Sequence, residues 1–363
     1  MTRLYDQLFT KQEILERVGD VSQICEAKFV RLAGGNREGV EAVFIKTGSG
    51  LNFTVLPGRG MDIGPADYKG LALSWRSSTG EVSPAYFEPE DSGMDRNYHG
   101  GLVHISGMTY SGLPCVDNGK SLGLHGRASN IPAQNVYVDG QWEGDDYSVW
   151  VYGKLRETSG LGENVMLSRR VTVKMGESKI TIEDHVENLA ADPVEHMILY
   201  HTNFGWPILD DSSELVAPTL KIEPMVPEMA KYIPEHAGFQ PPTAGYEGNL
   251  FYHDLATNQE GITQYALVNR KLNRSGLGIY LKYSKKMLPN LVEWKMMGKG
   301  HYVLECGPAN CRVNGRNVER ANGTLQFLRP YEARDYRIEI GILDGKEEIE
   351  NCVDEIRSLT VKG

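Results

Sequence analysis

Short runs of β-branched and aromatic residues, separated by Gly, Asn, Asp and Pro, make up most of the sequence. In the clearest example, segments 167–174 and 180–187 flank the turn 175–179, and their apolar residues recur at every second position. That period is typical of strands with one buried face, and the short turn between them indicates a hairpin. The same alternation runs through 51–55 and stops at Pro57-Gly58. With forty glycines available for turns, the pattern predicts an all-β protein.

Helices are expected only at the two ends of the chain. Thr10 can cap a first turn with Glu13 as its capping-box partner, and Gly19 is a stop signal. Residues 347–359 carry apolar side chains at helical intervals. No repeat, linker or shift in composition divides the 363 residues. We therefore expect one large β domain over 21–345, with a helical extension at 1–20 and a C-terminal helix at 346–363 packing on the same domain.

Charge and composition exclude several classes of partner. The formal net charge is −10, and no cluster of Lys and Arg offsets it, which argues against nucleic acid and anionic membranes. The N-terminus is polar and no apolar stretch approaches the length of a membrane span. Five cysteines without a CxxC pair fit a reducing compartment. A cytoplasmic location is the expectation.

Common catalytic motifs are missing from the sequence. We find no G-x-S-x-G elbow, phosphate-binding loop, strand-linked G-x-G-x-x-G or H-E-x-x-H pair. Cys306 and Cys311 lack a second pair of close ligands and are interpreted as ordinary buried thiols. No metal or other cofactor is predicted.

Two of the nine histidines have distinctive surroundings. His125 lies between glycines in Leu-Gly-Leu-His-Gly-Arg, where backbone or ligand can approach closely. His201 ends the apolar run 197–200 and precedes Thr-Asn-Phe-Gly-Trp-Pro. Aromatic, amide and imidazole groups together suit a sugar, whose ring face stacks on aromatics while its hydroxyls need polar partners. Six of the other seven are expected at the surface or as satisfied core residues, namely His104, His185, His196, His236, His253 and His301.

These histidine segments carry a family resemblance. The stretches 186–188, 191–193 and 199–207 resemble the second histidine motif of aldose 1-epimerases, and Leu-His-Gly at 124–126 resembles their L-H-G-G motif. The two histidines are 76 positions apart, which is similar to the family's separation.

The resemblance is closest to a divergent branch of mutarotase-like proteins, the DUF4432 type. It extends from about residue 20 to about residue 345 and rests on Pro-Gly-Arg-Gly-Met-Asp-Ile at 57–63, Trp-Arg-Ser at 75–77, GLHGRASNIPA from 123, and Tyr-Val-Leu at 302–304 followed by Pro-Ala-Asn at 308–310. It implies a galactose-mutarotase-like β-supersandwich.

The resemblance also implies acid/base chemistry on a hemiacetal. A carboxylate would take the proton of the anomeric hydroxyl, an imidazolium would protonate the ring oxygen, and the opened ring would reclose as the other anomer. His201 would be the acid, His125 a substrate-orienting partner and Glu305 the base. In this branch the acidic residue commonly stands directly before Pro-Ala-Asn, where this chain has Gly307, but positions 305 and 307 face the same side of a strand. Glu293 is the reserve candidate.

Substrate contacts are expected from five further residues: Arg59, Arg76, Arg127, Asn203 and Asp254. His99, in Tyr-His-Gly-Gly, competes with His125, but its 102-position gap to His201 fits less well. The expected partner is a monosaccharide or small glycoside. Two alternatives remain open: an enzyme that cleaves or eliminates across a glycosidic bond, and a non-catalytic carbohydrate-binding protein.

Overall fold

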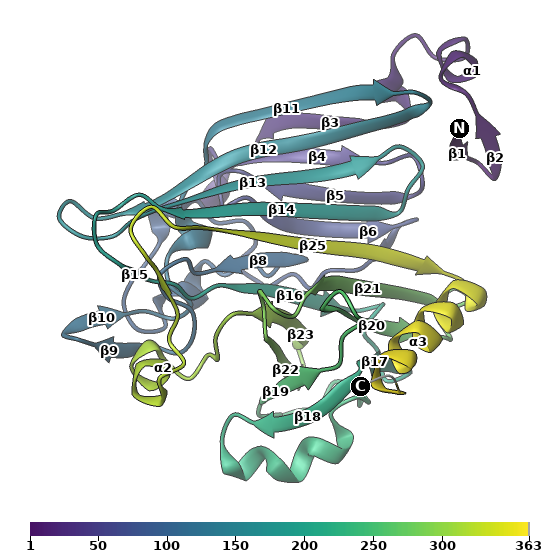
Figure 1. Ribbon diagram of the computed structural model, residues 1–363. Coiled ribbons are helices and arrows are strands. Elements are labelled where there is room, and N and C mark those ends of the chain that lie inside the picture. The colour runs from purple at the N-terminus through teal and green to yellow at the C-terminus, as the bar shows by residue number, and fades with distance from the viewer. Residues whose placement is uncertain (362–363) are drawn as a thin grey trace.

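The computed structural model describes residues 1–361, and most of them belong to two large antiparallel sheets (Figure 1). The first sheet has eight strands in the order β11 (Gln134–Glu143), β12 (Asp146–Thr158), β13 (Asn164–Lys174), β14 (Lys179–Asn188), β25 (Ala333–Asp344), β21 (Leu277–Ser284), β20 (Ile262–Asn269) and β17 (Ser213–Val216).

The second sheet has eleven strands and contains the segments singled out for their histidines. Its order is β18 (Thr219–Pro224), β19 (Asn249–Leu255), β22 (Asn290–Gly298), β23 (His301–Ala309), β16 (Leu199–Gly205), β8 (Val103–Ser106), β6 (Asp62–Tyr68), β5 (Leu51–Leu56), β4 (Glu41–Lys46) and β3 (Glu26–Arg31), with β7 (Leu71–Ala72) paired to β6. Three small two-stranded sheets pair β1 (Thr2–Leu4) with β2 (Gln7–Phe9), β9 (Cys115–Asp117) with β10 (Lys120–Leu122), and β15 (Val194–Glu195) with β24 (Phe327–Leu328).

The helices are short and peripheral. Helix α1 (Lys11–Leu15) has the predicted capping box at Thr10, but it ends four residues before Gly19, and the extension that precedes the sheets also contains β1 and β2. Helix α2 (Arg316–Asn322) was not expected from the sequence. Helix α3 (Lys346–Val361) confirms the C-terminal helix and buries Ile349, Val353 and Ile356 against the first sheet; residues 362–363 of that predicted segment lie outside the described residues. No helix among residues 1–361 combines the length and hydrophobicity needed to cross a bilayer.

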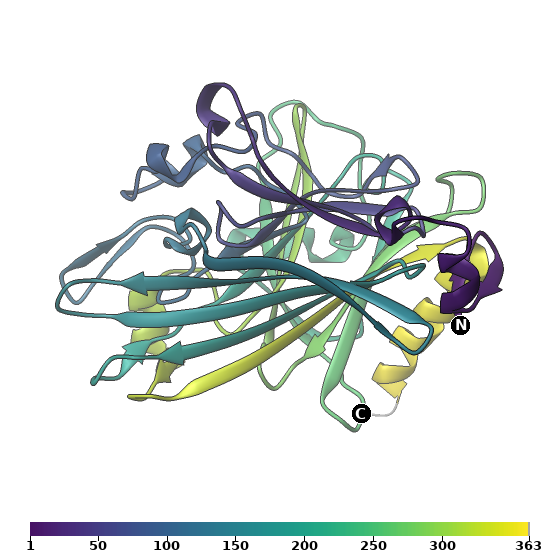
Figure 2. The same cartoon turned by 90° about the horizontal axis from the view of Figure 1, so that it is seen from above.

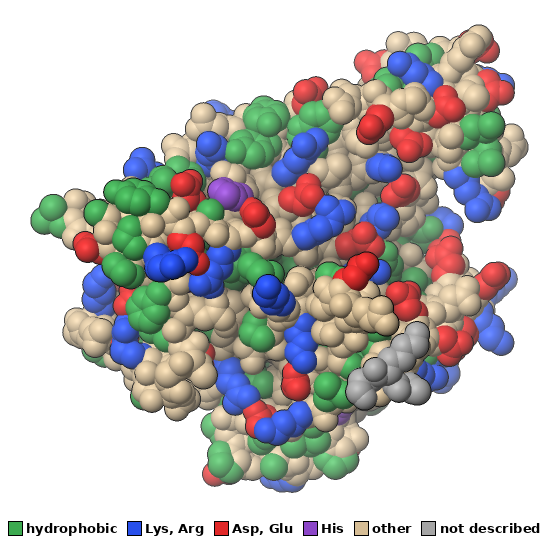
Figure 3. All heavy atoms as spheres, in the orientation of Figure 1, with side chains coloured by type: hydrophobic (Ala, Val, Ile, Leu, Met, Phe, Trp, Pro, Cys, Tyr) green, Lys and Arg blue, Asp and Glu red, His purple; other side chains and the backbone are tan. Residues whose placement is uncertain are grey.

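The predicted hairpin is confirmed as β13 and β14 at the centre of the first sheet. Its outward side chains are polar, as the alternation indicated, and His185 is half exposed with its Nδ1 2.7 Å from an oxygen of Asp335. Acidic and basic side chains are interspersed over the face of the molecule in Figure 3. One face of each strand is therefore solvated, and the other faces the second sheet.

A continuous apolar core fills the space between the two sheets. Inward residues of the first sheet, such as Val171 and Ile338, belong to the same buried cluster as Val43, Phe53 and Ile63 of the second. Seen from above, the purple strands of the second sheet form one layer and the teal and yellow strands of the first form another (Figure 2). The chain is thus a β-sandwich whose two layers share one core.

One ion pair lies within this core. Arg169 of β13 occupies an inward position in its strand and is fully buried, and its guanidinium donates to both carboxylate oxygens of Asp184 on β14, at 2.8 and 2.6 Å. The same guanidinium donates to the Met61 carbonyl at 3.1 Å, and the Tyr200 hydroxyl donates to Asp184 at 2.7 Å. Because Met61 and Tyr200 belong to the second layer, this network joins the two sheets directly beneath β16.

Replacing Arg169 by Met should destabilise the fold by about 3–5 kcal/mol, because the variant leaves a buried carboxylate without its cation. The matched control is Arg337→Met on the outer face of the same sheet, where the ion pair with Glu183 is exposed and its loss should cost about 0–1 kcal/mol. Urea unfolding of both variants measures the difference. Equal losses of unfolding free energy in the two variants would show that the buried ion pair stabilises the fold no more than the exposed one does.

Candidate active site

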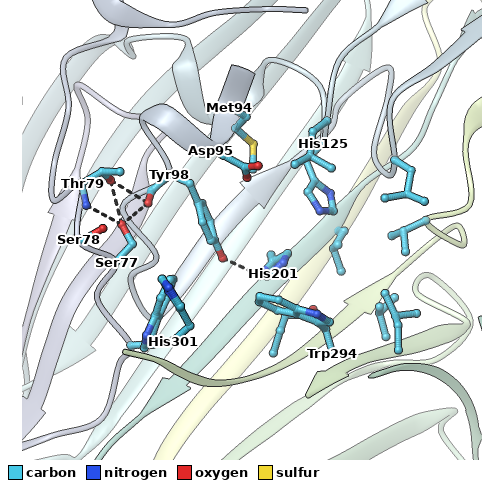
Figure 4. A pocket seen from close by; sticks show the side chains of 18 residues that line it. Ser77, Ser78, Thr79, Met94, Asp95, Tyr98, His125, His201, Trp294 and His301 are labelled. Atoms are coloured by element: carbon cyan, nitrogen blue, oxygen red, sulfur yellow. Dashed lines mark hydrogen bonds between the residues drawn. The ribbon is translucent and has the colours of Figure 1, made fainter. Parts of the chain in front are cut away.

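A cavity of about 450 Å³ opens beside the C-terminal half of the second sheet. Strands β16, β22 and β23 supply His201, Trp294 and Glu305 to its wall, and loops supply Tyr98 and His125 (Figure 4). The structure therefore brings together the three residues that the sequence predicted to carry the chemistry. Neighbouring strands place two of them, because β16 pairs with β23.

His201 is held in one tautomer by a chain of hydrogen bonds. The side-chain nitrogen of Asn203 donates to the Gly101 and His201 carbonyls, at 3.1 and 3.2 Å, so its Oδ1 faces Tyr98. The Tyr98 hydroxyl donates its only proton to that oxygen at 2.7 Å. His201 Nδ1, 3.2 Å from the same hydroxyl oxygen, must then carry the proton of this contact. In the neutral imidazole, Nε2 is left as a proton acceptor.

Burial reinforces this protonation state. Desolvation, followed by the nearby rings of His125 and His104, holds the pKa of His201 well below its ordinary value. Burial also raises the pKa of Tyr98, so its hydroxyl keeps its proton. His201 is thus a neutral base at physiological pH in the ligand-free protein.

His125 lies across from His201 at the end of a glycine-flanked turn. Its backbone has a φ of 56°, in the left-handed region that few non-glycine residues adopt, which directs the ring into the cavity (Figure 4). The centroids of the His125 and His201 rings are 5.3 Å apart, and the rings meet edge to face. Ser106 Oγ is 3.0 Å from His125 Nδ1, and burial lowers the pKa of His125 to about 3. A second neutral imidazole therefore borders the space where a substrate would bind.

Glu305 is one of two acidic residues that line the cavity, and Asp95 is the other. Glu305 pairs in register with Asn203, is only 1% exposed, and its Oε1 has no hydrogen-bond partner within the described residues. Desolvation, with a smaller contribution from the charge of Glu293, raises the pKa of Glu305 well above its ordinary value. Burial therefore favours a protonated carboxyl group at Glu305 and a neutral imidazole at His201.

Gly307 explains how an acid at position 305 can serve this cavity. A side chain at position 307 would begin against Glu305 Oε1, Leu199 and the Tyr200 carbonyl. The carboxylate of Glu305 thus occupies space that a residue at 307 would need. The strand register agrees, because Leu199 pairs with Ala309 and Asn203 with Glu305, which sets His201 opposite Gly307.

None of the five residues predicted to contact the substrate lines the cavity. Arg59 is fully buried behind it and donates to the Ser129, Val82 and Asn97 carbonyls, at 3.1, 2.6 and 3.0 Å. These hydrogen bonds hold the loops together, so Arg59 is a structural residue. Asn203 is also buried and does not line the cavity, but it contacts both Tyr98 and His201, which do.

The other three charged candidates have surface roles. Arg76 is about half exposed and forms an ion pair with the buried Glu81. Asp254 forms an ion pair with Lys285 at 2.6 Å and borders a separate depression. Arg127 is exposed and, although it follows His125 closely in sequence, lines a different pocket.

Two further histidine clusters have potential metal-ligating geometry. The first cluster consists of Asp62, His99 and His104, which are all buried, and one possible ligand atom from each lies within 4.8 Å of the others. Asp62 already accepts hydrogen bonds from the Ile105 amide and the Ser129 hydroxyl, at 2.8 and 2.7 Å. His99 is buried and does not line the cavity. Of the two histidines that compete for the first motif, His125 is therefore the one that lines the cavity.

The second cluster involves the reserve acid, Glu293. It lies on β22 between two residues that line the cavity, so the strand's alternation turns it to the opposite face. There it accepts from His253 Nε2 at 2.7 Å and His236 Nδ1 at 3.1 Å. Although burial would raise its pKa, these hydrogen bonds hold that pKa below the ordinary value. One carboxylate oxygen of Glu293 is thus engaged by two histidines on the face away from the cavity.

Several cavity residues were not identified from the sequence. Tyr98, Trp75, Trp294 and His301 all line the cavity, and their aromatic or imidazole groups give it a sugar-compatible surface. Trp294 alone offered a local signal, because it alternates with the buried positions of β22. The others arrive from loops or a strand end, where no periodicity marks them.

Comparison with known proteins agrees with this architecture. The family model described as a domain of unknown function, DUF4432, matches residues 37–342. The chain belongs to this family. No functionally curated protein matches it significantly.

Solved structures show the fold. A Klebsiella pneumoniae protein provisionally described as an aldose 1-epimerase superposes with a TM-score of 0.87 at 23% identity, covering 92% of this chain and 87% of its own. A galactose mutarotase-like protein from Clostridium acetobutylicum has a TM-score of 0.60 at 12% identity, and a galactose 1-epimerase from Lactobacillus acidophilus one of 0.57 at 12%; each comparison covers 89% of this chain and all of the other. The predicted mutarotase-like β-supersandwich is confirmed.

Gly307→Ala should destabilise this DUF4432 protein by about 1–3 kcal/mol, because its Cβ meets the Tyr200 carbonyl oxygen at 2.7 Å. Gly298→Ala is the control on the same hairpin, where the nearest atom is the Met296 sulfur at 3.6 Å. Thermal unfolding monitored by circular dichroism compares the two. If both variants melt alike, position 307 is not sterically reserved for the Glu305 carboxylate.

Proposed function

We propose that this protein interconverts the anomers of an aldose by acid/base catalysis in the cavity between His201 and Glu305. The observation that carries the proposal is the pairing of a neutral imidazole, with Nε2 unprotonated, and a buried carboxyl group that retains a proton. One group that accepts and one that donates are what ring opening of a hemiacetal requires. The fold relationship to mutarotase-like structures supports the same reaction class.

The reaction then proceeds without net proton change. His201 Nε2 removes the proton of the anomeric hydroxyl, the oxygen's electron pair forms the carbonyl, and the bond from C1 to the ring oxygen breaks as Glu305 protonates that oxygen. Rotation about C1–C2 and the reverse transfers give the other anomer. His125 would orient the substrate through its ring nitrogen.

These roles have the opposite polarity to those that the family resemblance implies, in which Glu305 is the base and His201 the acid. The two descriptions differ only by transfer of one proton between the two side chains. They contain the same total number of protons and therefore give the same dependence of rate on pH. The desolvation that lowers the pKa of His201 favours its neutral form as the starting state, and the hydrogen bonds from Asn203 through Tyr98 fix its tautomer.

Glu305→Gln should lower the rate of anomer exchange by about 10²–10⁴-fold, since the amide cannot transfer a proton to the ring oxygen. Two-dimensional NMR exchange between anomer signals, over a panel of aldoses, measures the rate above the spontaneous one. Glu260→Gln, in an exposed turn, is the control. No acceleration by the wild type would refute the proposal, and release of sugar from disaccharides or tight binding without turnover would identify the function as glycoside cleavage or carbohydrate binding.

His201 should remain neutral with its proton on Nδ1 between about pH 6 and pH 8, because its pKa is lowered from an ordinary value inside that range. The exchange rate should fall in acid, once His201 is protonated, and in alkali, once Glu305 loses its proton above its raised pKa. Nitrogen-15 chemical shifts of the imidazole report the tautomer. Tyr98→Phe removes the acceptor for Nδ1 and should change those shifts; an unchanged tautomer in that variant would contradict the assignment.

A further inference from the structure

The cavity has two chemically different ends on either side of the catalytic pair. Ser77, Ser78, Thr79 and His301 lie together on one side in Figure 4, with Tyr98 between them and His201. Unlabelled side chains drawn only in carbon cover the opposite side. The aliphatic residues that line the cavity are Leu113, Leu124, Leu199, Leu250, Val292 and Val313, and we call them the aliphatic wall.

Most of the aliphatic wall is held in place by packing in the folded core. Leu199, Val292 and Val313 form one buried cluster, with exposures of 0%, 1% and 3%, and Leu250 packs against it. Leu113, at the edge, is 45% exposed although its backbone is fixed by a hydrogen bond to the Val313 carbonyl at 2.8 Å. An exposed leucine that borders a catalytic cavity offers apolar surface to a ligand.

The wall starts close to the reacting groups. Leu199 precedes His201 by two positions on β16, so the two side chains face the same side about 7 Å apart along the strand. Leu250 pairs in register with Trp294, and Val292 with Gly307. The absence of a side chain at Gly307 is what allows Leu199 to approach this part of the cavity. A sugar ring held at His201 and Glu305 therefore has one edge directed at aliphatic carbon.

The charges around the cavity select against anionic sugars. None of its lining residues within the described chain is Lys or Arg, while Asp95 and Glu305 are acidic. Arg76 is paired to Glu81 and Arg127 lines another pocket. A phosphate or carboxylate on the substrate would be desolvated without a cation to compensate it.

We propose that the substrate is an uncharged aldose that carries an apolar substituent away from its anomeric carbon, such as a short O-alkyl or O-acyl group or the methyl group of a deoxy sugar. The substituent packs on the aliphatic wall while the hemiacetal remains free at His201 and Glu305. This inference rests on the proposed anomer exchange, but it concerns recognition and has its own readout.

The experiment compares aldoses that differ in one position. Glucose and galactose are each assayed unmodified, as their 3-O-, 4-O- and 6-O-propyl ethers, and as their 6-phosphates, by NMR anomer exchange and by isothermal titration calorimetry. At least one propyl ether should exceed its parent about tenfold in kcat/KM and in affinity, and the phosphates should fall below the parents. The proposal is overturned if no ether exceeds its parent, or if a phosphate is preferred.

Binding and catalysis fail separately in this design. Preferential binding of an ether without any exchange would overturn the proposed reaction and leave the recognition proposal intact. Exchange of parent sugars at the same rate as their ethers would overturn the recognition proposal and leave the proposed reaction intact. Leu113→Ser should reduce the ratio of ether to parent several-fold, whereas Leu161→Ser, at an exposed leucine outside the cavity, should leave that ratio as in the wild type.

Discussion

The buried interaction of Arg169 with Asp184 fixes the position of the strand on which the site is built. Both residues belong to the first sheet, but their remaining hydrogen-bonding groups are satisfied by Met61 and Tyr200 of the second. Burial alone would lower the pKa of Arg169, but the charge and hydrogen bonds of Asp184 more than compensate, so the guanidinium keeps its charge inside the core. Tyr200 precedes His201 directly, and its alternation turns the imidazole to the opposite face, toward the cavity.

The same burial that stabilises the sandwich sets the chemistry of the site. Desolvation penalises the charged form of any group, so it lowers the pKa of His201 and raises that of Glu305. Burial therefore favours a His201–Glu305 pair that is neutral overall and has one proton available on Glu305. In the reaction proposed above, such a pair would supply both the proton donor and the proton acceptor for ring opening.

Sequence reasoning identified the parts of the site that local pattern encodes. His201 follows an apolar strand and His125 lies between glycines, and both reach the cavity. Glu305 was assigned by the family resemblance, and the two-residue period of a strand allowed an acid at 305 to replace one at 307. Arg59 and Asp254 were assigned substrate contacts that the structure does not show, because their partners, such as the Val82 carbonyl and Lys285, are distant in sequence. Tyr98 enters from a loop, where only tertiary contacts decide the direction of a side chain.

Position 307 links the proposed catalytic acid to the proposed recognition surface. Because Gly307 has no side chain, the carboxylate of Glu305 and the side chain of Leu199 can both occupy the space beside it. A larger residue could supply an acid at 307, but it would displace the leucine that begins the aliphatic wall. Relocating the acid by two positions therefore changes more than the attachment point of a carboxylate. In the recognition proposed above, an acid at 305 leaves room for Leu199 at the edge of the cavity, so that the same proton chemistry would act on a sugar with an apolar substituent.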